Sequence, residues 1–409
     1  MAVVASPPDP APRYREQHAK TITRLRGTVD PWFIGRYGMN LYRGCEHGCI
    51  YCDGRAERYY VPGDFSRDIT VKRNAVQVLA RELTRIKEPG FVFLGGGVCD
   101  AYQPAEEHFR LARGVLELAR DHRLPVQVLT KAALVERDLD LLTAINDQTR
   151  AILSFSIQTL DDDLRQRFEP GAAPIAERLR LLAAAKERGL GTGVMAMPVL
   201  PGLSDQPGHV DELVGRAAAI GVDFVLGGGL TLRPGVQKDT YFAVLTEHHP
   251  DLVEGYRRAY SRDHASGVPD HRYLARVDKR FAAALARHKL PGRPPRRLFQ
   301  GLMPLYAEVG VLLEHREFER HQAGTLGGGL GRAGRAIQGW ARQEFTKRGR
   351  RKAFDSTVLD GELRAMVDGG TLQQLPGVTA EAAALVRSWV ADLDARPGQA
   401  ELELPRPKP

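Results

Sequence analysis

The chain has 409 residues, of which 43% are hydrophobic and 26% charged, with a formal net charge of +8. This length exceeds what one hydrophobic core usually serves, so we expect more than one structural unit. No apolar run approaches the roughly 18 residues of a membrane helix, and the proline-rich start lacks the pattern of a signal peptide. These features favour a cytoplasmic protein with no membrane partner. The positive charge suits a polyanion, but many soluble proteins carry as much.

Residues 1–29 are rich in proline and charge and predict a disordered or extended arm. From residue 30 to residue 290, short apolar runs alternate with amphipathic stretches whose apolar residues recur every three or four positions. The expected strands are 91–97, 126–131, 151–157, 193–200 and 222–228, and the expected helices 71–87, 106–121, 175–188 and 210–220. With a first strand before Cys45, this predicts an α/β fold of about six βα units around a parallel sheet.

The composition changes after Leu290, where the proline- and arginine-rich LPGRPPRRLFQG marks a linker or domain edge. We interpret 291–355 as a helical and basic linker region. It includes a helix near 305–320, a glycine-rich run at 324–336 and a basic run at 346–352. The glycine run has no preceding strand, so it indicates a flexible joint rather than a phosphate cradle. Residues 356–396 predict a helix-hairpin-helix-like unit, and 397–409 a disordered tail.

Three of the four cysteines, Cys45, Cys49 and Cys52, lie within eight residues in a glycine-flanked loop. Such crowding indicates a metal site in a reducing compartment rather than a disulfide framework. Thiolates bind iron–sulfur clusters, and a cubane held by only three of them leaves one iron open. The alternative is zinc, with His47 or a distant residue as fourth ligand. Structural zinc usually needs a second cysteine pair, however, and Cys99 is the only other cysteine.

The three cysteines with Tyr51 resemble the cluster motif of the radical S-adenosylmethionine (SAM) superfamily. The resemblance implies a partial (β/α)6 TIM-type barrel, with the cysteines holding a [4Fe–4S] cluster and Tyr51 beside the adenine of SAM. In that family the open iron chelates SAM. An electron, here expected from a reductase or a flavodoxin or ferredoxin, then cleaves SAM to a 5′-deoxyadenosyl radical.

Further segments resemble the spore photoproduct lyase-like branch of that superfamily, whose members are often labelled DNA repair photolyases. The resemblance covers residues 40 to 260, more than half the chain. It is carried by 40–55, by Asp100-Ala-Tyr-Gln-Pro104 with Glu106, and by Thr130-Lys131, Arg137-Asp138, Phe168-Glu169-Pro170-Gly171 and Arg233-Pro234-Gly235-Val236. It implies radical chemistry on a nucleic acid, with DNA lesion repair as one form of it.

Several residues at the ends of expected strands are candidates for binding SAM, because the working face of a barrel lies at the carboxyl ends of its strands. Asp100 and Lys131 each follow a strand, and the resemblance assigns Lys131 to the SAM carboxylate. Ser156 and Gln158 share one face of their strand. The full set of expected cofactor-binding residues is Tyr51, Gly95, Gly96, Gly97, Asp100, Lys131, Ser156 and Gln158, in which the glycines give the SAM amine close access to the backbone.

Cys99 is the candidate catalytic residue. In spore photoproduct lyases a cysteine after the equivalent strand is thought to return a hydrogen atom to the product radical. Aligned on Asp100, Cys99 stands about two positions away from that cysteine. The alternative role is that of a small buried hydrophobe, which is common for free cysteine.

The segment 372–389 resembles a helix-hairpin-helix with a Pro-Gly-Val turn, a motif whose turn amides bind a phosphate. Thr379 stands where that motif usually has a second glycine, and an ordinary αα-hairpin is the alternative. The neighbouring basic run Lys347 to Lys352, with Arg293, Arg296 and Arg297, favours contacts to phosphates.

Three hypotheses follow. The first is a radical SAM enzyme acting on DNA or RNA, in which the barrel performs the chemistry and the carboxyl-terminal helices dock the strand. The second keeps the radical chemistry but acts on a protein or a small molecule. The third is a non-catalytic zinc and nucleic-acid binding protein.

Overall fold

The structure is a computed structural model that describes residues 11–25, 27–86, 88–262, 264–348 and 356–394. Its centre is a seven-stranded sheet in the order β10-β9-β8-β7-β6-β3-β2, in which six strands run parallel and β2 (Thr23–Leu25) is antiparallel to β3. The parallel strands are β3 (Gly35–Met39), β6 (Phe91–Leu94), β7 (Val126–Thr130), β8 (Ala151–Ser156), β9 (Gly191–Val199) and β10 (Phe224–Gly229). The predicted α/β fold with about six βα units is confirmed.

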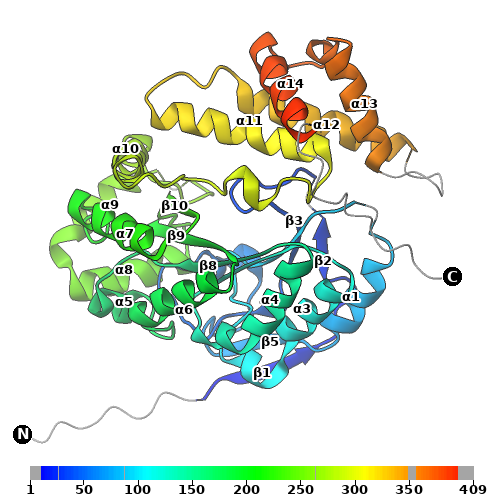
Figure 1. Cartoon of the computed structure of the whole chain (residues 1–409). Helices are drawn as coiled ribbons and strands as arrows, with labels where there is room; N and C mark the ends of the chain where they lie inside the picture. The colour runs from blue at the N-terminus through cyan, green and yellow to red at the C-terminus, as the bar shows by residue number, and fades with distance from the viewer. Residues whose placement is uncertain (1–10, 26, 87, 263, 349–355, 395–409) are drawn as a thin grey trace, which may run out of the picture.

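Helices cover the outer face of this sheet, as Figure 1 shows. They are α1 (Ala75–Leu83), α3 (Leu111–Asp121), α4 (Leu139–Gln148), α6 (Ile175–Glu187), α7 (Pro207–Ile220) and α10 (His271–His288). Strand β8 is buried along its whole length. Strands that are buried on both faces carry apolar runs rather than alternation, which is why these segments could be located in the sequence.

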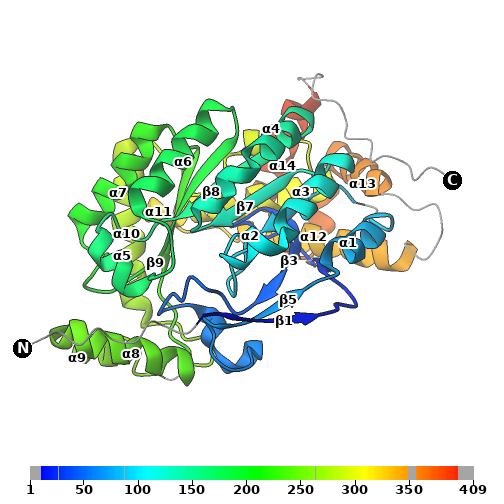
Figure 2. The ribbon, with the colours of Figure 1, turned by 90° about the horizontal axis from the view of Figure 1, so that it is seen from below.

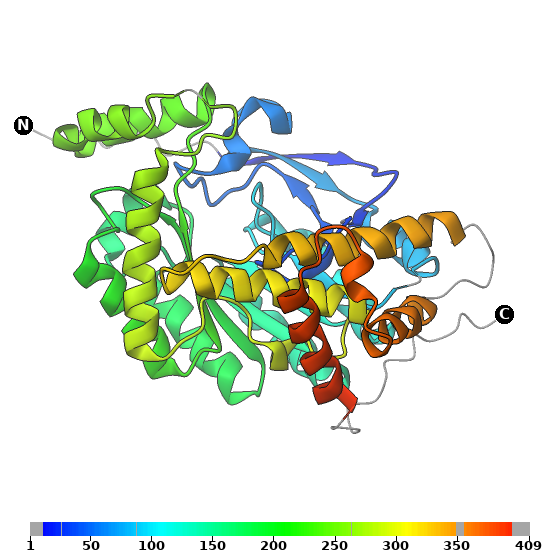
Figure 3. The same cartoon turned by 90° about the horizontal axis from the view of Figure 1, so that it is seen from above.

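The inner face of the sheet meets the carboxyl-terminal helices at one end. Phe91, Ile152 and Phe224 share a core with α11 (Leu305–Gln322), α12 (Leu330–Arg348), α13 (Ser356–Asp368) and α14 (Ala380–Asp394). These three residues are the first or second of their strands. The helical layer, seen from above in Figure 3, therefore closes the amino-terminal end of the barrel.

The four carboxyl-terminal helices form one packed unit rather than a linker followed by a hairpin. The glycine-rich run, expected to be a flexible joint, is partly built into α12. A Cβ on Gly334 would lie 2.5 Å from the carbonyl oxygen of Gly310, so these two glycines let α12 approach α11 closely. Of the predicted basic run, residues 349–352 lie outside the described residues.

The described part of the predicted amino-terminal arm is extended and contributes strands. β1 (Arg13–Gln17) pairs in parallel with β5 (Asp68–Lys72), which pairs antiparallel with β4 (Tyr42–Arg43). Figure 2 shows this small sheet beside the main one. Every residue of β1 is exposed, so the strand has no alternating apolar pattern from which it could be predicted. In the described part of the chain, no helix is long and apolar enough to cross a membrane.

Candidate functional site

The cysteine loop follows β4 directly and lies over the carboxyl end of β6. The backbone amide of Cys45 donates to the carbonyl of Phe65 (2.8 Å), which ties the loop to the small sheet. The Sγ of Cys52 lies 3.9 Å from the carbonyl oxygen of Gly97, just after β6. Gly44 and Gly48 have positive φ angles, so the tight turns around Cys45 need glycine.

The segment 168–171 holds the loop from the other side. The amide of Ile50 donates to the carbonyl of Phe168 (2.9 Å), and that of Gly171 to the carbonyl of His47 (2.9 Å). A Cβ on Gly171 would collide with the carbonyl of Glu46. Arg55 braces the loop from within by donating to the carbonyls of Cys49 (2.8 Å) and Gly48 (2.7 Å). Residues 168–171, part of the resemblance described above, therefore hold the cysteine loop in position.

The donor set of the loop is three thiols. Among the described residues, no three His, Cys, Asp or Glu side chains converge as ligands of a single metal ion. A cubane binds each thiolate at a different iron, so its ligands need not converge on one point. Burial raises the pKa of Cys49 to about 12, and each thiol keeps its proton until a metal displaces it. His47, the fourth zinc ligand considered above, instead faces Asp100, with Nδ1 3.4 Å from a carboxylate oxygen.

Asp100 connects the cysteine loop to the ends of two strands. Its carboxylate accepts hydrogen bonds from the amides of Tyr102 and Lys131 (both 2.8 Å) and from the hydroxyl of Thr130 (2.9 Å). His47 lies beside the same carboxylate, so groups of the protein surround both oxygens of Asp100. These contacts hold Asp100 in place beside the cysteine loop, and its contact with the cofactor stays a prediction.

Lys131 and Ser156, two of the expected cofactor-binding residues, contact each other. The Nζ of Lys131 donates to the Oγ of Ser156 (2.7 Å), which donates to the carbonyl of Met197 (3.0 Å). The same ammonium lies 5.8 Å from the ring centroid of Tyr51 and 3.9 Å from Glu169. Lys131, Ser156 and Glu169, from three separate segments, thus gather beside Tyr51 of the cysteine loop.

Glu169 and Arg178 complete this group, and sequence reasoning assigned neither of them to the site. Both side chains are fully buried and form an ion pair of 2.7 Å, and Glu169 also accepts a hydrogen bond from the hydroxyl of Tyr51. Arg178 falls on the buried face of α6 with Ile175 and Leu181. A charged residue at a core position of a helix was the available signal, because such a residue needs a partner.

The group carries more positive than negative charge. Burial favours the neutral acid of Glu169, but Arg178 and Lys131 together hold the pKa of this carboxyl below its ordinary value. One carboxylate thus faces two cations, Lys131 and Arg178. The surplus charge beside Tyr51 and Cys49 suits an anionic group such as a carboxylate.

Polar atoms without partners mark a space for a ligand on the inner face. Both amide atoms of Gln158 and the hydroxyl of Ser154 are buried and find no hydrogen-bond partner among the residues that the structure describes. A Cβ on Gly97 would meet nothing within 4 Å, whereas on Gly95 or Gly96 it would collide with Leu129 or Asn40. Buried polar groups in native proteins are nearly always satisfied, so these atoms fit a polar ligand or water. The residues present fit the groups that the motif implies.

Cys99 lies at the same end of the barrel and is buried. Burial raises the pKa of its thiol to about 12, so it is a neutral S–H at neutral pH. The charges of Lys72, Asp100 and Cys52 act on it, which places it near the cluster loop. Its role as a hydrogen donor stays a prediction.

The carboxyl-terminal hairpin lies at the other end of the barrel. It consists of α13, a short 3-10 turn at Leu372–Gln374 and α14, so its first helix precedes the predicted one. The hydroxyl of Thr379 accepts from the amide of Ala382 (3.2 Å) and caps α14, where the motif would offer amides to a phosphate. This unit packs on the amino-terminal strand ends, away from the cysteine loop, and docking of a substrate strand by these helices stays a prediction.

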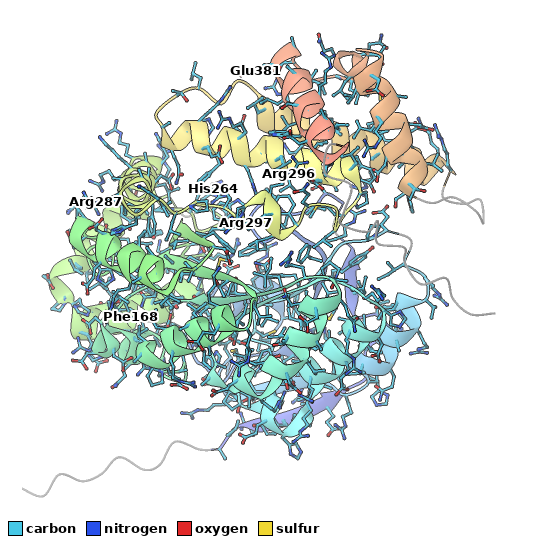
Figure 4. All side chains as sticks on the ribbon, viewed as in Figure 1. Phe168, His264, Arg287, Arg296, Arg297 and Glu381 are labelled. Carbon is cyan, nitrogen blue, oxygen red and sulfur yellow. The ribbon has the colours of Figure 1, made fainter. Side chains whose placement is uncertain are left out.

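The arginines that were expected to bind phosphate are instead paired with carboxylates or buried within the protein. Arg296 pairs with Glu308 (2.9 Å), Arg297 pairs with Asp223 (2.7 Å), and Arg293 is buried. Figure 4 shows Arg296 and Arg297 at the junction of barrel and helical layer, away from Phe168. Lys347 and Arg348 pair with Glu344 on their own helix. These charges stabilise the junction and α12.

Comparison with known proteins agrees with the site. The profile of the Radical SAM superfamily matches residues 39–214. The uncharacterized protein Rv2578c of Mycobacterium tuberculosis (strain ATCC 25618 / H37Rv) is 35% identical over 281 residues, 67% of this chain and 82% of the relative. The uncharacterized protein MJ0683 of Methanocaldococcus jannaschii is 29% identical over 182 residues, 44% of this chain and 65% of the relative. The chain belongs to the radical SAM superfamily.

Solved structures of spore photoproduct lyases are similar to this chain in fold. A spore photoproduct lyase complexed with dinucleoside spore photoproduct superposes with a TM-score of 0.50 at 15% identity, covering 68% of this chain and 80% of the lyase. A mutant of that lyase gives 0.51 at 17% identity over the same shares. At such identities the likeness extends to the fold alone. The protein is a radical SAM enzyme, and the cofactors of its family are a [4Fe–4S] cluster and SAM.

Proposed function

We propose that this radical SAM enzyme acts on a nucleic acid, with a DNA lesion as the first substrate to test. Cys45, Cys49 and Cys52 would hold the cluster, while Lys131 and Gln158 would bind SAM beside Tyr51. When bound, the cofactors supply a 5′-deoxyadenosyl radical that abstracts hydrogen from the substrate. The chain's own residues bind and orient: Ser156 and Glu169 fix the Lys131 ammonium, and the buried inner face excludes water.

The observation that carries the nucleic-acid proposal is the basic face of the small sheet. In its register, Arg15 of β1 and Arg43 of β4 both pair with Thr70 of β5, so they flank Thr70 on one face. Arg13 and Lys72 alternate onto the same face, opposite only one acidic residue, Asp68. Arg15 and Arg43 are exposed, and a hollow of about 550 Å³ lies over Arg13, Arg15 and Thr70.

This face leads directly into the site. Arg43 is followed by Gly44 and the cluster ligand Cys45. Lys72, on the same face, lies close enough to Cys99 for its charge to lower the pKa of that thiol, against the larger effect of burial. Exposed arginines of this kind bind nucleic acid through its phosphates.

The first experiment is anaerobic incubation of the reconstituted, reduced protein with SAM, following 5′-deoxyadenosine with and without ultraviolet-irradiated DNA. We expect a yield that rises with irradiated DNA. A slow yield of 5′-deoxyadenosine that does not depend on DNA or RNA would support the radical chemistry but contradict a nucleic-acid substrate. The second hypothesis, a protein or small-molecule substrate, would then be favoured. Zinc in place of iron and sulfide in the purified protein would contradict the cluster itself.

A binding experiment tests the docking face separately. The double variant Arg15→Glu with Arg43→Glu should weaken binding of a fluorescent single-stranded oligonucleotide at low salt by roughly tenfold or more, and flatten its salt dependence. Arg387→Glu makes the same change on an exposed position of α14 and should leave binding unchanged. Equal loss in both variants, or loss only in Arg387→Glu, would contradict docking on the small sheet.

A further inference from the structure

A second cavity lies at the opposite end of the barrel from the cysteine loop. It has a volume of about 840 Å³, is open to solvent on one side and is lined by residues of α10, the proline-rich segment 290–296, α11 and α14. Small-molecule sites usually measure about 300–1,000 Å³. The carbonyl of Pro291 accepts from the amide of Val225 (3.1 Å), near the start of β10, which fixes this cavity at the amino-terminal strand ends.

Most of the wall is apolar. Helix α10 contributes Leu285, α11 contributes Leu312 and Phe318, and α14 contributes Leu385 and Trp389. The imidazole of His315 also lines it and is held neutral, because burial lowers its pKa to about 4 and its Nε2 donates to the carbonyl of Pro31 (2.6 Å). This wall suits the apolar body of an organic molecule.

Arg293 brings a charge into this apolar wall. It is 7% exposed, and its guanidinium lies over the rings of Trp32 (4.3 Å) and Phe318 (3.4 Å). Its Nη1 donates to the carbonyl of Gly292 (2.8 Å). No described carboxylate forms an ion pair with it. Burial lowers the pKa of Arg293 to about 10, which still leaves it protonated at neutral pH.

The other charges of the lining are matched. Arg316 pairs with Glu319 (2.9 Å), and Arg296 pairs with Glu308 (2.9 Å) and lies 3.9 Å from Asp392. Among the described residues, Arg293 is therefore the cation of this lining without a carboxylate in ion-pair contact, since Asp278 and Asp30 act on it only from a longer distance. A buried cation without a counterion is costly, and an anion that enters the cavity relieves this cost.

We propose that this cavity binds a small organic anion, whose acidic group pairs with Arg293 and whose apolar body packs on Leu312, Leu385 and Trp389. The site is separate from the cluster site and does not depend on the substrate proposed there. Its ligand would contact both the barrel and the carboxyl-terminal unit, because α10 and α14 form opposite parts of its wall.

The test uses two fluorescent probes with the same ring system. 8-Anilino-1-naphthalenesulfonate carries a sulfonate that N-phenyl-1-naphthylamine lacks, so the ratio of their affinities reports the anion contact. A hydrogen bond to a charged group is worth enough that we expect the sulfonate to bind the full-length protein about tenfold more tightly or better. Arg293→Leu should abolish this preference, and Arg316→Leu, the same change at a paired arginine of the same cavity, should retain it.

A second variant locates the probe. Leu385→Trp fills the cavity without touching Arg293 and should weaken both probes, with circular dichroism melts showing that each variant is folded. If Arg293→Leu does not fold, two results decide the question. They are the preference of the wild-type protein for the sulfonate probe and the weaker binding of that probe to Leu385→Trp. Equal affinity of the two probes for the wild type, or sulfonate binding that Leu385→Trp leaves intact, would overturn the proposal.

Discussion

Glu169 balances the charges beside the cysteine loop, although the sequence analysis gave this residue no role of its own in the site. Its carboxylate is the partner of Arg178 and lies near Lys131, and it anchors Tyr51. Replacing Glu169 by Gln leaves the fully buried Arg178 without its counterion and removes the carboxylate near the partly buried Lys131. We therefore expect Glu169→Gln to lower the free energy of unfolding of the metal-free protein by about 3–5 kcal/mol, measured by urea denaturation.

The pH dependence of this loss has a definite sign. The folded state lowers the pKa of Glu169, so its contribution is full above the ordinary glutamate pKa and is lost as the pH falls through the folded-state value. The difference between variant and wild type should shrink in acid. Glu136→Gln, which breaks a half-exposed pair with Arg180, is the matched control and should change stability by less than about 1 kcal/mol. Similar losses of unfolding free energy in Glu169→Gln and Glu136→Gln would contradict the role of Glu169 as the counterion of the buried Arg178.

At the scale of elements, two glycines of α12 should respond to alanine in opposite ways. A Cβ at Gly334 meets the backbone of α11, so Gly334→Ala should destabilise the protein by about 1–3 kcal/mol. A Cβ at Gly339 meets nothing within 4 Å, so Gly339→Ala should stabilise by about 0.5–1 kcal/mol through helix propensity. Thermal melts of the two variants give the comparison, and equal shifts would contradict close packing of α11 on α12.

The same scale shows what sequence could and could not predict. β7 was expected at 126–131 and β8 at 151–157, and the structure places them at Val126–Thr130 and Ala151–Ser156, because both are buried apolar runs. The three cysteines could be singled out because their spacing is local, and their role as cluster ligands stays a prediction. β1 was missed because its stability comes from pairing with β5 rather than from an apolar face. The pairing of Glu169 with Arg178 was missed because it depends on how α6 packs.

At the scale of the whole molecule, the barrel and the carboxyl-terminal helices share one core. Leu313 of α11 is fully buried in the cluster that also contains Phe91, Ile152 and Phe224 at the strand ends. The linker predicted after Leu290 does not separate two independent cores, since the segment it occupies carries ion pairs to both sides, through Arg296 and Arg297. The two parts should therefore unfold together.

Leu313→Ala tests this shared core. Removing a buried leucine should cost about 2–5 kcal/mol, because it loses burial and leaves a cavity. Far-UV circular dichroism reports the whole chain, whereas tryptophan fluorescence is weighted towards Trp340 and Trp389 of the helical unit. If the core is shared, both signals should shift to the same lower midpoint in the variant and remain coincident. A fluorescence transition that moves while the circular dichroism keeps a separate, unshifted phase would show that the barrel is stable without its helical layer.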